Sequence, residues 1–225
     1  MSKLTWDGTG ERFYQSGVSH GVFYPIAVSG YGEGVAWNGL TSVNESPEGA
    51  EATDLWADNI KYATMRSAED FKFSIGAYHY PEEFEECQGK ATPTGLTGVH
   101  VGQQARKAFG LCYRTEKSND QNVEGYVIHV IYNATCDPSD QEFTTINDSP
   151  DAIEFSWDCS SLPVPVTGMK PTSMMTFDSQ ELGTAKMTKL EELLYGSDSG
   201  SGSGSGTAAS LPDPDTIIAA LKAVT

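Results

Sequence analysis

The chain has 225 residues, and 14 lysines and arginines against 31 aspartates and glutamates give it a formal net charge of −17 at pH 7. An acidic chain repels the phosphate backbone, which argues against tight binding of nucleic acid but not against its passage alongside. Composition alone favours the simpler interpretation that the acidic surface keeps the protein soluble. Hydrophobic residues at 38% and aromatic residues at 10% argue against intrinsic disorder and predict one main folded domain.

The cysteines and the chain start bear on the compartment. Cys87, Cys112, Cys136 and Cys159 lie more than twenty residues apart without a C-x-x-C pair, which does not predict a disulfide framework. The polar, glycine-rich start has no signal-peptide stretch, and no run approaches the ~20 apolar residues of a membrane span. We therefore expect assembly in reducing cytoplasm, with no membrane partner.

The first third of the chain predicts short strands and a hairpin. Residues 13–28 and 34–43 alternate polar with apolar side chains, and glycines between them suit turns. Residues 46–66 begin as a loop and continue as two extended arms that meet at Asp58 and Asn59, residue types that tolerate tight turns. This segment predicts a β-hairpin.

Three segments alternate with a period of two, which predicts strands buried on one side only. In residues 71–80 the apolar face holds Phe71, Phe73, Ile75 and Ala77, and the other face holds Lys72, Ser74, Gly76, Tyr78 and Tyr80. In residues 106–116, Phe109, Leu111 and Tyr113 oppose Arg106, Ala108, Cys112 and Arg114. In residues 152–159, Ile153, Phe155 and Trp157 oppose Glu154, Ser156 and Asp158. Such strands are typical of open antiparallel sheets, whose unpaired edges invite a neighbouring subunit.

The middle of the chain adds a short helix and two further strands. Pro81, followed by two glutamates that complement a helix N-terminus, predicts a helix over residues 81–88 that ends at Gly89. Residues 126–132 are apolar on both faces, which places this strand in the centre of the sheet, with His129 as a core histidine. Residues 171–178 predict another strand.

Helices are predicted for the last part of the chain. Asp178 with Glu181 has the pattern of a capping box, and Met187, Leu190, Leu193 and Leu194 follow on one face of a helix that stops at Gly196. Residues 197–210 are rich in glycine and serine and predict a flexible linker, natural or engineered. In residues 211–225, Asp213 and Pro214 start an amphipathic helix that docks on its own subunit or on a neighbour. We expect residues 1–196 to form the β domain, with 1–10 as a candidate arm.

Catalytic patterns in the chain are weak. Residues 17–21 match G-x-S-x-G, but a nucleophile elbow needs a strand before Ser19 and a helix after it, whereas the segment continues in extended form. No histidine stands at helical spacing from another metal ligand, no phosphate-binding loop occurs, and the acidic clusters are typical of solvated loops. We expect no enzyme activity, no cofactor and no metal.

Several long segments in one order closely resemble the major tail protein, the tail tube protein, of long-tailed bacteriophages with non-contractile tails. They are residues 34–89, 101–115, 145–158, 167–179 and 190–196 within a resemblance that runs from about Glu11 to Gly196. The resemblance implies a mainly β subunit, sandwich-like or barrel-like, with a flanking helix. It implies hexameric rings that stack into a hollow tube, in the virion, through which DNA passes to the host. Tape measure, tail terminator and distal tail proteins are the implied partners.

On that hypothesis the polar faces of the one-sided strands would line the channel. The candidate lumen positions are Lys72, Ser74, Gly76, Tyr78, Arg106, Ala108 and Arg114. A lumen of net negative charge would let double-stranded DNA pass without adhering. The competing class is a monomeric binding module, such as a carbohydrate-binding β-sandwich displayed on a particle; a hydrolase ranks third.

Overall fold

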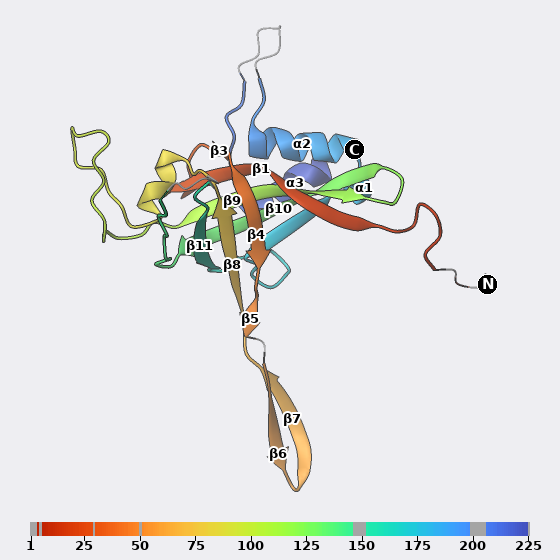
Figure 1. Ribbon diagram of the computed structural model, residues 1–225. Coiled ribbons are helices and arrows are strands. Elements are labelled where there is room, and N and C mark those ends of the chain that lie inside the picture. The colour runs from red at the N-terminus through yellow and green to blue at the C-terminus, as the bar shows by residue number, and fades with distance from the viewer. Residues whose placement is uncertain are drawn as a thin grey trace.

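The computed structural model describes residues 4, 6–28, 30–49, 51–145, 152–198 and 206–224, and it is mainly β. The predicted mainly β fold class is confirmed, because the structure has a large antiparallel sheet and a few helices, one of them C-terminal (Figure 1). The strands are β1 (Tyr14–Ala27), β2 (Gly30–Tyr31), β3 (Val35–Trp37), β4 (Leu40–Glu45), β5 (Glu48–Gly49), β6 (Ala52–Ala57), β7 (Ile60–Arg66), β8 (Glu69–Ala77), β9 (Phe109–Ser118), β10 (Val123–Cys136), β11 (Phe155–Ser161) and β12 (Met174–Asp178). The helices are the 3₁₀ helix η1 (Glu82–Glu86), α1 (Ser179–Leu182), α2 (Thr184–Tyr195) and α3 (Pro214–Ala223).

The main sheet of the described chain runs in the order β2-β1-β9-β10-β11-β8-β4, with β3, β12 and β5 as side branches. β10 is its central strand, since β9 pairs along one side and β12 and β11 share the other. Apolar side chains on both faces of β10 are buried, as the two-sided pattern of residues 126–132 predicted. The sheet is curled, as the contact between β1 and β4 near its two ends shows.

A first core fills the concave side of this curled sheet. Phe71, Phe73 and Ile75 of β8 point into it, which confirms the predicted apolar face of that strand. Phe84 of η1, with none of its surface exposed, closes the core among the rings of Phe23, Trp37, Phe109 and Trp157. The predicted short helix is therefore present, in the tighter 3₁₀ form, and it supplies one buried side chain.

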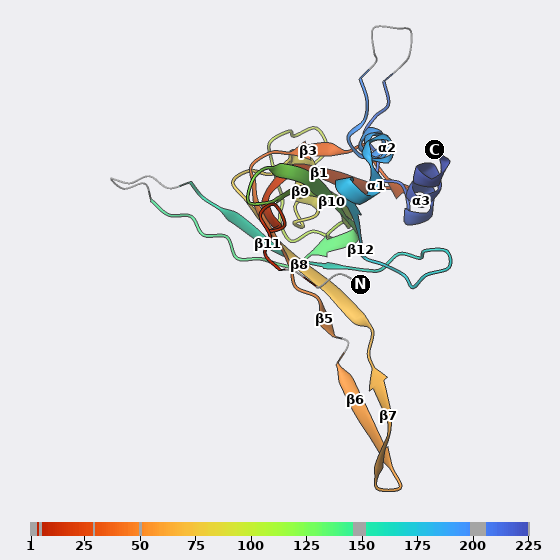
Figure 2. The ribbon, with the colours of Figure 1, turned by 90° about the vertical axis from the view of Figure 1, so that its right-hand side faces the viewer.

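A second core lies on the other face of the sheet, under the helices (Figures 1 and 2). Met187, Leu190 and Leu194 of α2 pack there, as the helical spacing predicted, and Leu193 is half-buried. Ile217 and Leu221 of α3 join the same core. The C-terminal helix thus docks on its own subunit, one of the two alternatives that the sequence left open.

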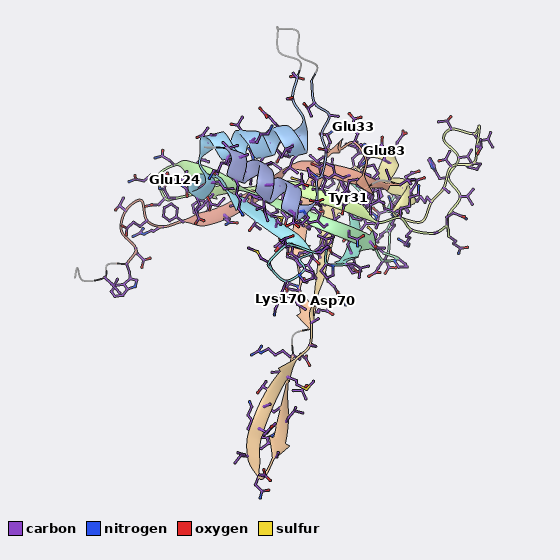
Figure 3. The ribbon with its side chains drawn as sticks, turned by 180° about the vertical axis from the view of Figure 1, so that it is seen from behind. Tyr31, Glu33, Asp70, Glu83, Glu124 and Lys170 are labelled. Carbon is purple, nitrogen blue, oxygen red and sulfur yellow. The ribbon has the colours of Figure 1, made fainter. Side chains whose placement is uncertain are left out.

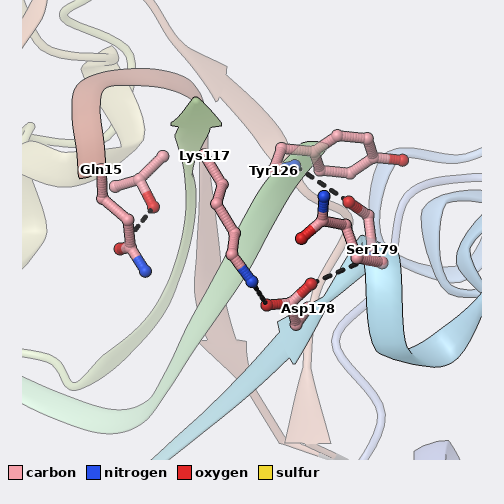
Figure 4. Close-up of polar contacts among 7 residues, drawn as sticks. Gln15, Lys117, Tyr126, Asp178 and Ser179 are labelled. Carbon is pink, nitrogen blue, oxygen red and sulfur yellow. Dashed lines mark hydrogen bonds and ion pairs between the residues drawn. The ribbon is translucent and has the colours of Figure 1, made fainter. Parts of the chain in front are cut away.

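A predicted strand and a predicted helix differ from the structure. The strand predicted over 106–116 begins at Phe109, and it is buried on both faces rather than one, since Cys112 lies in the second core. The helix predicted from Asp178 to Tyr195 is broken at Gly183, whose φ of 77° lies in the left-handed region. Asp178 caps α1 by accepting a hydrogen bond from the Gln180 amide at 2.8 Å, as Figure 4 shows beside its ion pair with Lys117.

The ends of the linker and of the candidate N-terminal arm touch the body. Gly10 donates its amide hydrogen to Asp120 Oδ1 at 2.8 Å, and Ser197 pairs with Thr207 in an isolated bridge. The Ser210 amide donates to the Leu193 carbonyl at 2.9 Å, next to the start of the C-terminal segment. Of the predicted linker, residues 199–205 lie outside the described part of the chain.

Candidate functional site

The hairpin of β6 and β7 projects from the body as a separate two-stranded ribbon (Figures 1 and 2). Its turn residues Asp58 and Asn59 have φ of 51° and 62°, the geometry of a tight hairpin turn, which confirms the predicted turn. Asp54 forms an ion pair with Lys61 at 2.7 Å and accepts a hydrogen bond from Thr64 Oγ1 at 2.9 Å. These bonds add to the backbone ladder that sets the register of the ribbon.

The hairpin carries large apolar side chains that its own chain leaves uncovered. The exposed members are Leu55, Trp56, Ile60, Tyr62 and Met65. Trp56 is 69% exposed and Tyr62 73% exposed. Figure 3 shows the side chains of this ribbon standing out into solvent beyond Asp70 at its base. Five large apolar side chains exposed on one projecting element favour an interaction site, because larger exposed apolar surfaces mark contacts with a partner.

A second surface is the polar side of strands β4, β8 and β11, which we call the serine-rich face. Its members share the side of the sheet opposite the first core and align through the strand register: Ser42, Asn44, Lys72, Ser74, Gly76, Ser156, Asp158 and Ser160. Lys72 forms an ion pair with Glu48 at 2.7 Å. Gly76 is covered, since a Cβ there would lie 2.5 Å from Ser42 Oγ and 3.2 Å from Glu154 Oε1. The face is therefore hydrophilic, and its glycine position is closely covered by neighbouring side chains.

The structure brings together only part of the predicted lumen set. Lys72, Ser74 and Gly76 lie on the serine-rich face, and Tyr78 follows β8 as an exposed residue. Arg106 and Ala108 precede β9, so they are not strand positions as predicted.

Arginine side chains of that set are engaged elsewhere. Arg106 Nη1 donates to the carbonyl oxygens of Cys136 and Asp137 at 3.3 and 3.2 Å, at the end of β10. Arg114 is on the helix-covered side of β9, with its guanidinium carbon 4.6 Å from the centroid of the Tyr126 ring. Neither shares a surface with Lys72.

A partly buried polar cluster between β4, β9 and β10 was not predicted from the sequence. Tyr113 donates a hydrogen bond to Glu45 Oε1 and stacks on the His129 ring, with centroids 4.6 Å apart. His129 Nε2 shares a hydrogen bond with Thr115 at 3.0 Å, and its Nδ1 lies 3.6 Å from Glu45, beyond hydrogen-bond distance. Burial lowers the pKa of His129 and outweighs the opposing effect of Glu45. The carboxylate partner is 84 positions away in the chain, so spacing could not reveal it.

The G-x-S-x-G segment is part of a strand. β1 continues through it to Ala27, with two register irregularities against β9 on either side of Ser19. Gly17 and His20 have positive φ, 69° and 53°, as in a bulge. Ser19 Oγ lies 3.1 Å from His20 Nδ1 at the surface, but the strand-turn-helix context of a nucleophile elbow is replaced by continuous sheet.

Two pockets on the surface of the described chain are shallow. One of about 320 Å³ lies between β1 and β4 and includes Ser42 and Asn44 of the serine-rich face. The other, of about 180 Å³, is lined by Gln88, Lys90, Arg106, Asp137, Ser139, Gln141 and Trp157. Neither lining includes a histidine or a cysteine, so neither pocket places a nucleophile beside an imidazole. No group of three metal-type side chains gathers among the residues that the structure describes.

Comparison with known proteins gives no match that would assign a function. No family model matches the chain, and no curated protein sequence matches it. Among the described helices, none combines the length and the apolar character needed to cross a membrane. The uncovered hairpin and the serine-rich face are the features that a function has to explain.

Proposed function

We propose that the protein is a structural subunit that assembles with copies of itself into stacked hexameric rings, forming the tail tube of a bacteriophage with a non-contractile tail. The observation that carries this proposal is the projecting hairpin β6-β7 with its uncovered apolar side chains. Fully burying one such side chain contributes on the order of 1.5–3 kcal/mol. Two aromatic side chains per subunit, repeated around a ring, would therefore contribute to association together with the other contacts between subunits.

The antiparallel sheet supports the same proposal. β12 pairs with β10 alone among the described strands, so its other edge has backbone groups available for a neighbouring strand. Head-to-tail contacts that close by rotation form rings, and a barrel built from strands of many subunits encloses a wide channel. The fold therefore has the free strand edge that ring assembly through strand pairing requires.

The serine-rich face suits the wall of that channel. Lys72 is paired with Glu48, whereas Asp158 is exposed on the same face, so the unpaired charge there is negative. DNA would bind such a wall only weakly, because the face has serine hydroxyls and a negative potential and no cluster of cations to bind the phosphates. DNA would slide along such a wall during ejection into the host, with the tape measure, tail terminator and distal tail proteins as partners in tail assembly.

Negative-stain electron microscopy of the purified chain tests the proposal. We expect rings or tubes from the wild-type protein at high concentration or with purified tail-tip complexes as initiator. The double variant Trp56→Ser, Tyr62→Ser should remain folded by circular dichroism but fail to assemble. A matched control, Leu96→Ser with Val99→Ser, removes two exposed apolar side chains from a loop of the body and should assemble.

Two results would count against assembly. One is a wild-type chain that stays monomeric with the initiator present; binding of a glycan by that monomer would favour the carbohydrate-binding alternative. The other is a hairpin variant that forms tubes as readily as the wild type, which would remove the observation on which the proposal depends.

A further inference from the structure

Cys136 and Cys159 form a facing pair of thiols across two strands. They are direct register partners of β10 and β11, and their sulfur atoms lie 3.1 Å apart. Both side chains are buried in the first core, with 1% and 2% of their surface exposed. The cysteines lie 23 positions apart in the chain, so only the strand register brings them together.

The backbone places this pair at the type of site where a cross-strand bond fits. The Asp137 amide donates to the Asp158 carbonyl at 2.8 Å, so the neighbouring pair, Asp137 and Asp158, is the hydrogen-bonded one. Hydrogen-bonded and non-hydrogen-bonded pairs alternate along antiparallel strands, which makes Cys136 and Cys159 a non-hydrogen-bonded pair. Cα atoms of such pairs lie about 4.5 Å apart, inside the 4.4–6.8 Å range of disulfides. Closing the S–S bond to about 2.05 Å requires a movement of only about 1 Å.

The other thiols have different surroundings. Cys112 lies in the second core, on the opposite side of the sheet, near the Tyr195 hydroxyl. Cys87 belongs to the first core, close enough to Cys136 for the two to influence each other's charge. Burial raises the pKa of Cys136, so the group is a protonated thiol at neutral pH. Only a small oxidant that enters during local opening of β11 would reach the pair.

We propose that Cys136 and Cys159 are a redox modification site, a dithiol that peroxide oxidants convert into a cross-strand disulfide. During local opening one thiol of the pair loses its proton, and the thiolate sulfur attacks one oxygen of hydrogen peroxide. An S–O bond forms, the O–O bond breaks, and the departing hydroxide takes up the released proton and leaves as water. The second sulfur then attacks the sulfenic acid, the S–S bond forms, the S–O bond breaks, and the hydroxide leaves as a second water. Two thiols and one peroxide thus give one disulfide and two waters.

This inference is independent of the proposed assembly. It gives the fold a covalent link between β10 and β11 that is absent while the protein is reduced and forms on exposure to peroxide. A disulfide over a span of this length is expected to raise the melting temperature by on the order of 5–10 °C.

The test is peroxide titration of the reduced, full-length chain. Remaining thiols are alkylated in denaturant and counted. The chain is digested without reduction by a glutamyl endopeptidase, which cuts between the two cysteines at Glu142 and Glu154, and the peptides are mapped by mass spectrometry. We expect a fall from four free thiols to two, a Cys136–Cys159 cross-linked peptide, and a higher melting temperature that a reductant reverses. The Cys112→Ala control should form the same peptide, with one free thiol, Cys87, remaining.

The Cys136→Ala variant gives an independent readout. Cys159 then has no resolving partner at its register position, and it should gain one oxygen atom without forming the cross-link. Mapping of the wild-type chain keeps the test decisive even if this variant does not fold. The proposal would be overturned by a Cys87–Cys136 link as the main product, or by Cys136 and Cys159 that stay reduced or pass to sulfonic acids without pairing.

Discussion

Gly110 of β9 lies directly beneath Leu211, so close that a Cβ on Gly110 would come within 2.3 Å of Leu211 Cδ2. Leu211 is 4% exposed in the second core and leads into α3. The missing side chain of a strand glycine therefore makes room for the segment that anchors the C-terminal helix. This contact joins positions about one hundred residues apart in the chain.

Gly110→Ala should destabilise the docked C-terminal segment. Overpacking a well-filled core costs about 1–3 kcal/mol, and here the displaced group is the anchor of α3. Urea unfolding should show the loss of stability, and amide hydrogen exchange should be faster in α3 than in the wild type. Gly102→Ala is the matched control, because a Cβ at Gly102 meets nothing within 4 Å. Equal stability of the two variants would contradict the prediction.

Tyr24→Phe should weaken the contact between β1 and α2. Tyr24 is fully buried, and its hydroxyl donates a hydrogen bond to the Leu194 carbonyl at 2.6 Å, near the end of α2. Removing the donor leaves a buried carbonyl without its partner, which costs about 1–3 kcal/mol. Chemical denaturation measures the difference. Tyr62→Phe on the exposed hairpin serves as control and should leave the unfolding free energy unchanged.

Asp178 should make stability fall at acid pH. Partial burial raises the pKa of this carboxyl, but hydrogen bonds from Lys117 Nζ at 2.6 Å and from the Gln180 amide outweigh it, so the net pKa is lowered (Figure 4). A carboxyl with a lowered folded-state pKa stabilises the fold above its unfolded pKa of about 3.9, and the contribution is lost as pH falls through the folded value.

The variant that checks this is Asp178→Asn, which keeps an N-cap but loses the charge. We expect it to be less stable than the wild type at pH 7 by about 1 kcal/mol and to lose less stability between pH 4 and pH 2. Thermal melts across that range give both values. Glu192→Gln, on the exposed side of α2, should keep the wild-type slope. An unchanged slope in Asp178→Asn would show that another acid is responsible.

His129 should make stability fall in a different pH window. Its pKa is lowered in the folded state, mainly by burial, so the fold prefers the neutral imidazole. Above an unfolded pKa of about 6.5 neither state binds the proton and stability is full. As pH falls below that value the unfolded chain takes up the proton first, and stability declines until the folded pKa is passed.

His129→Gln should flatten the stability curve between pH 7 and pH 5. Unfolding midpoints in urea, taken at steps across this range, measure the slope. His79→Gln, at an exposed position after β8, is the control and should retain the wild-type slope. If the His129→Gln variant kept the wild-type dependence of stability on pH, a different group would be responsible for the effect.

Local pattern was sufficient for several elements. The period of two in β8 separates Phe71 and Phe73 from Lys72 and Ser74, and Asp58-Asn59 makes its tight turn, because pleat and turn geometry depend on adjacent residues. The central place of β10 also followed from its apolar side chains on both faces. The exposed hairpin was predicted as a hairpin, but its separation from the body was not, since nothing local tells a strand which surface it will meet.

Tertiary structure decided which faces are covered and which distant residues meet. β9 is buried on both sides because helices encoded some eighty residues later lie over Cys112. The same helices lie on the side of β9 that carries Arg114, whereas Lys72 is on β8, in the part of the sheet that they leave uncovered. The pairing of Cys136 with Cys159 depends on the register of β10 against β11, and that of His129 with Glu45 on the curl of the sheet. Alternation and turn chemistry act over a few residues, so the sequence by itself determined most of the strands and helices. Burial depends on which distant segment packs against each face, so only the tertiary structure decided which surfaces are exposed.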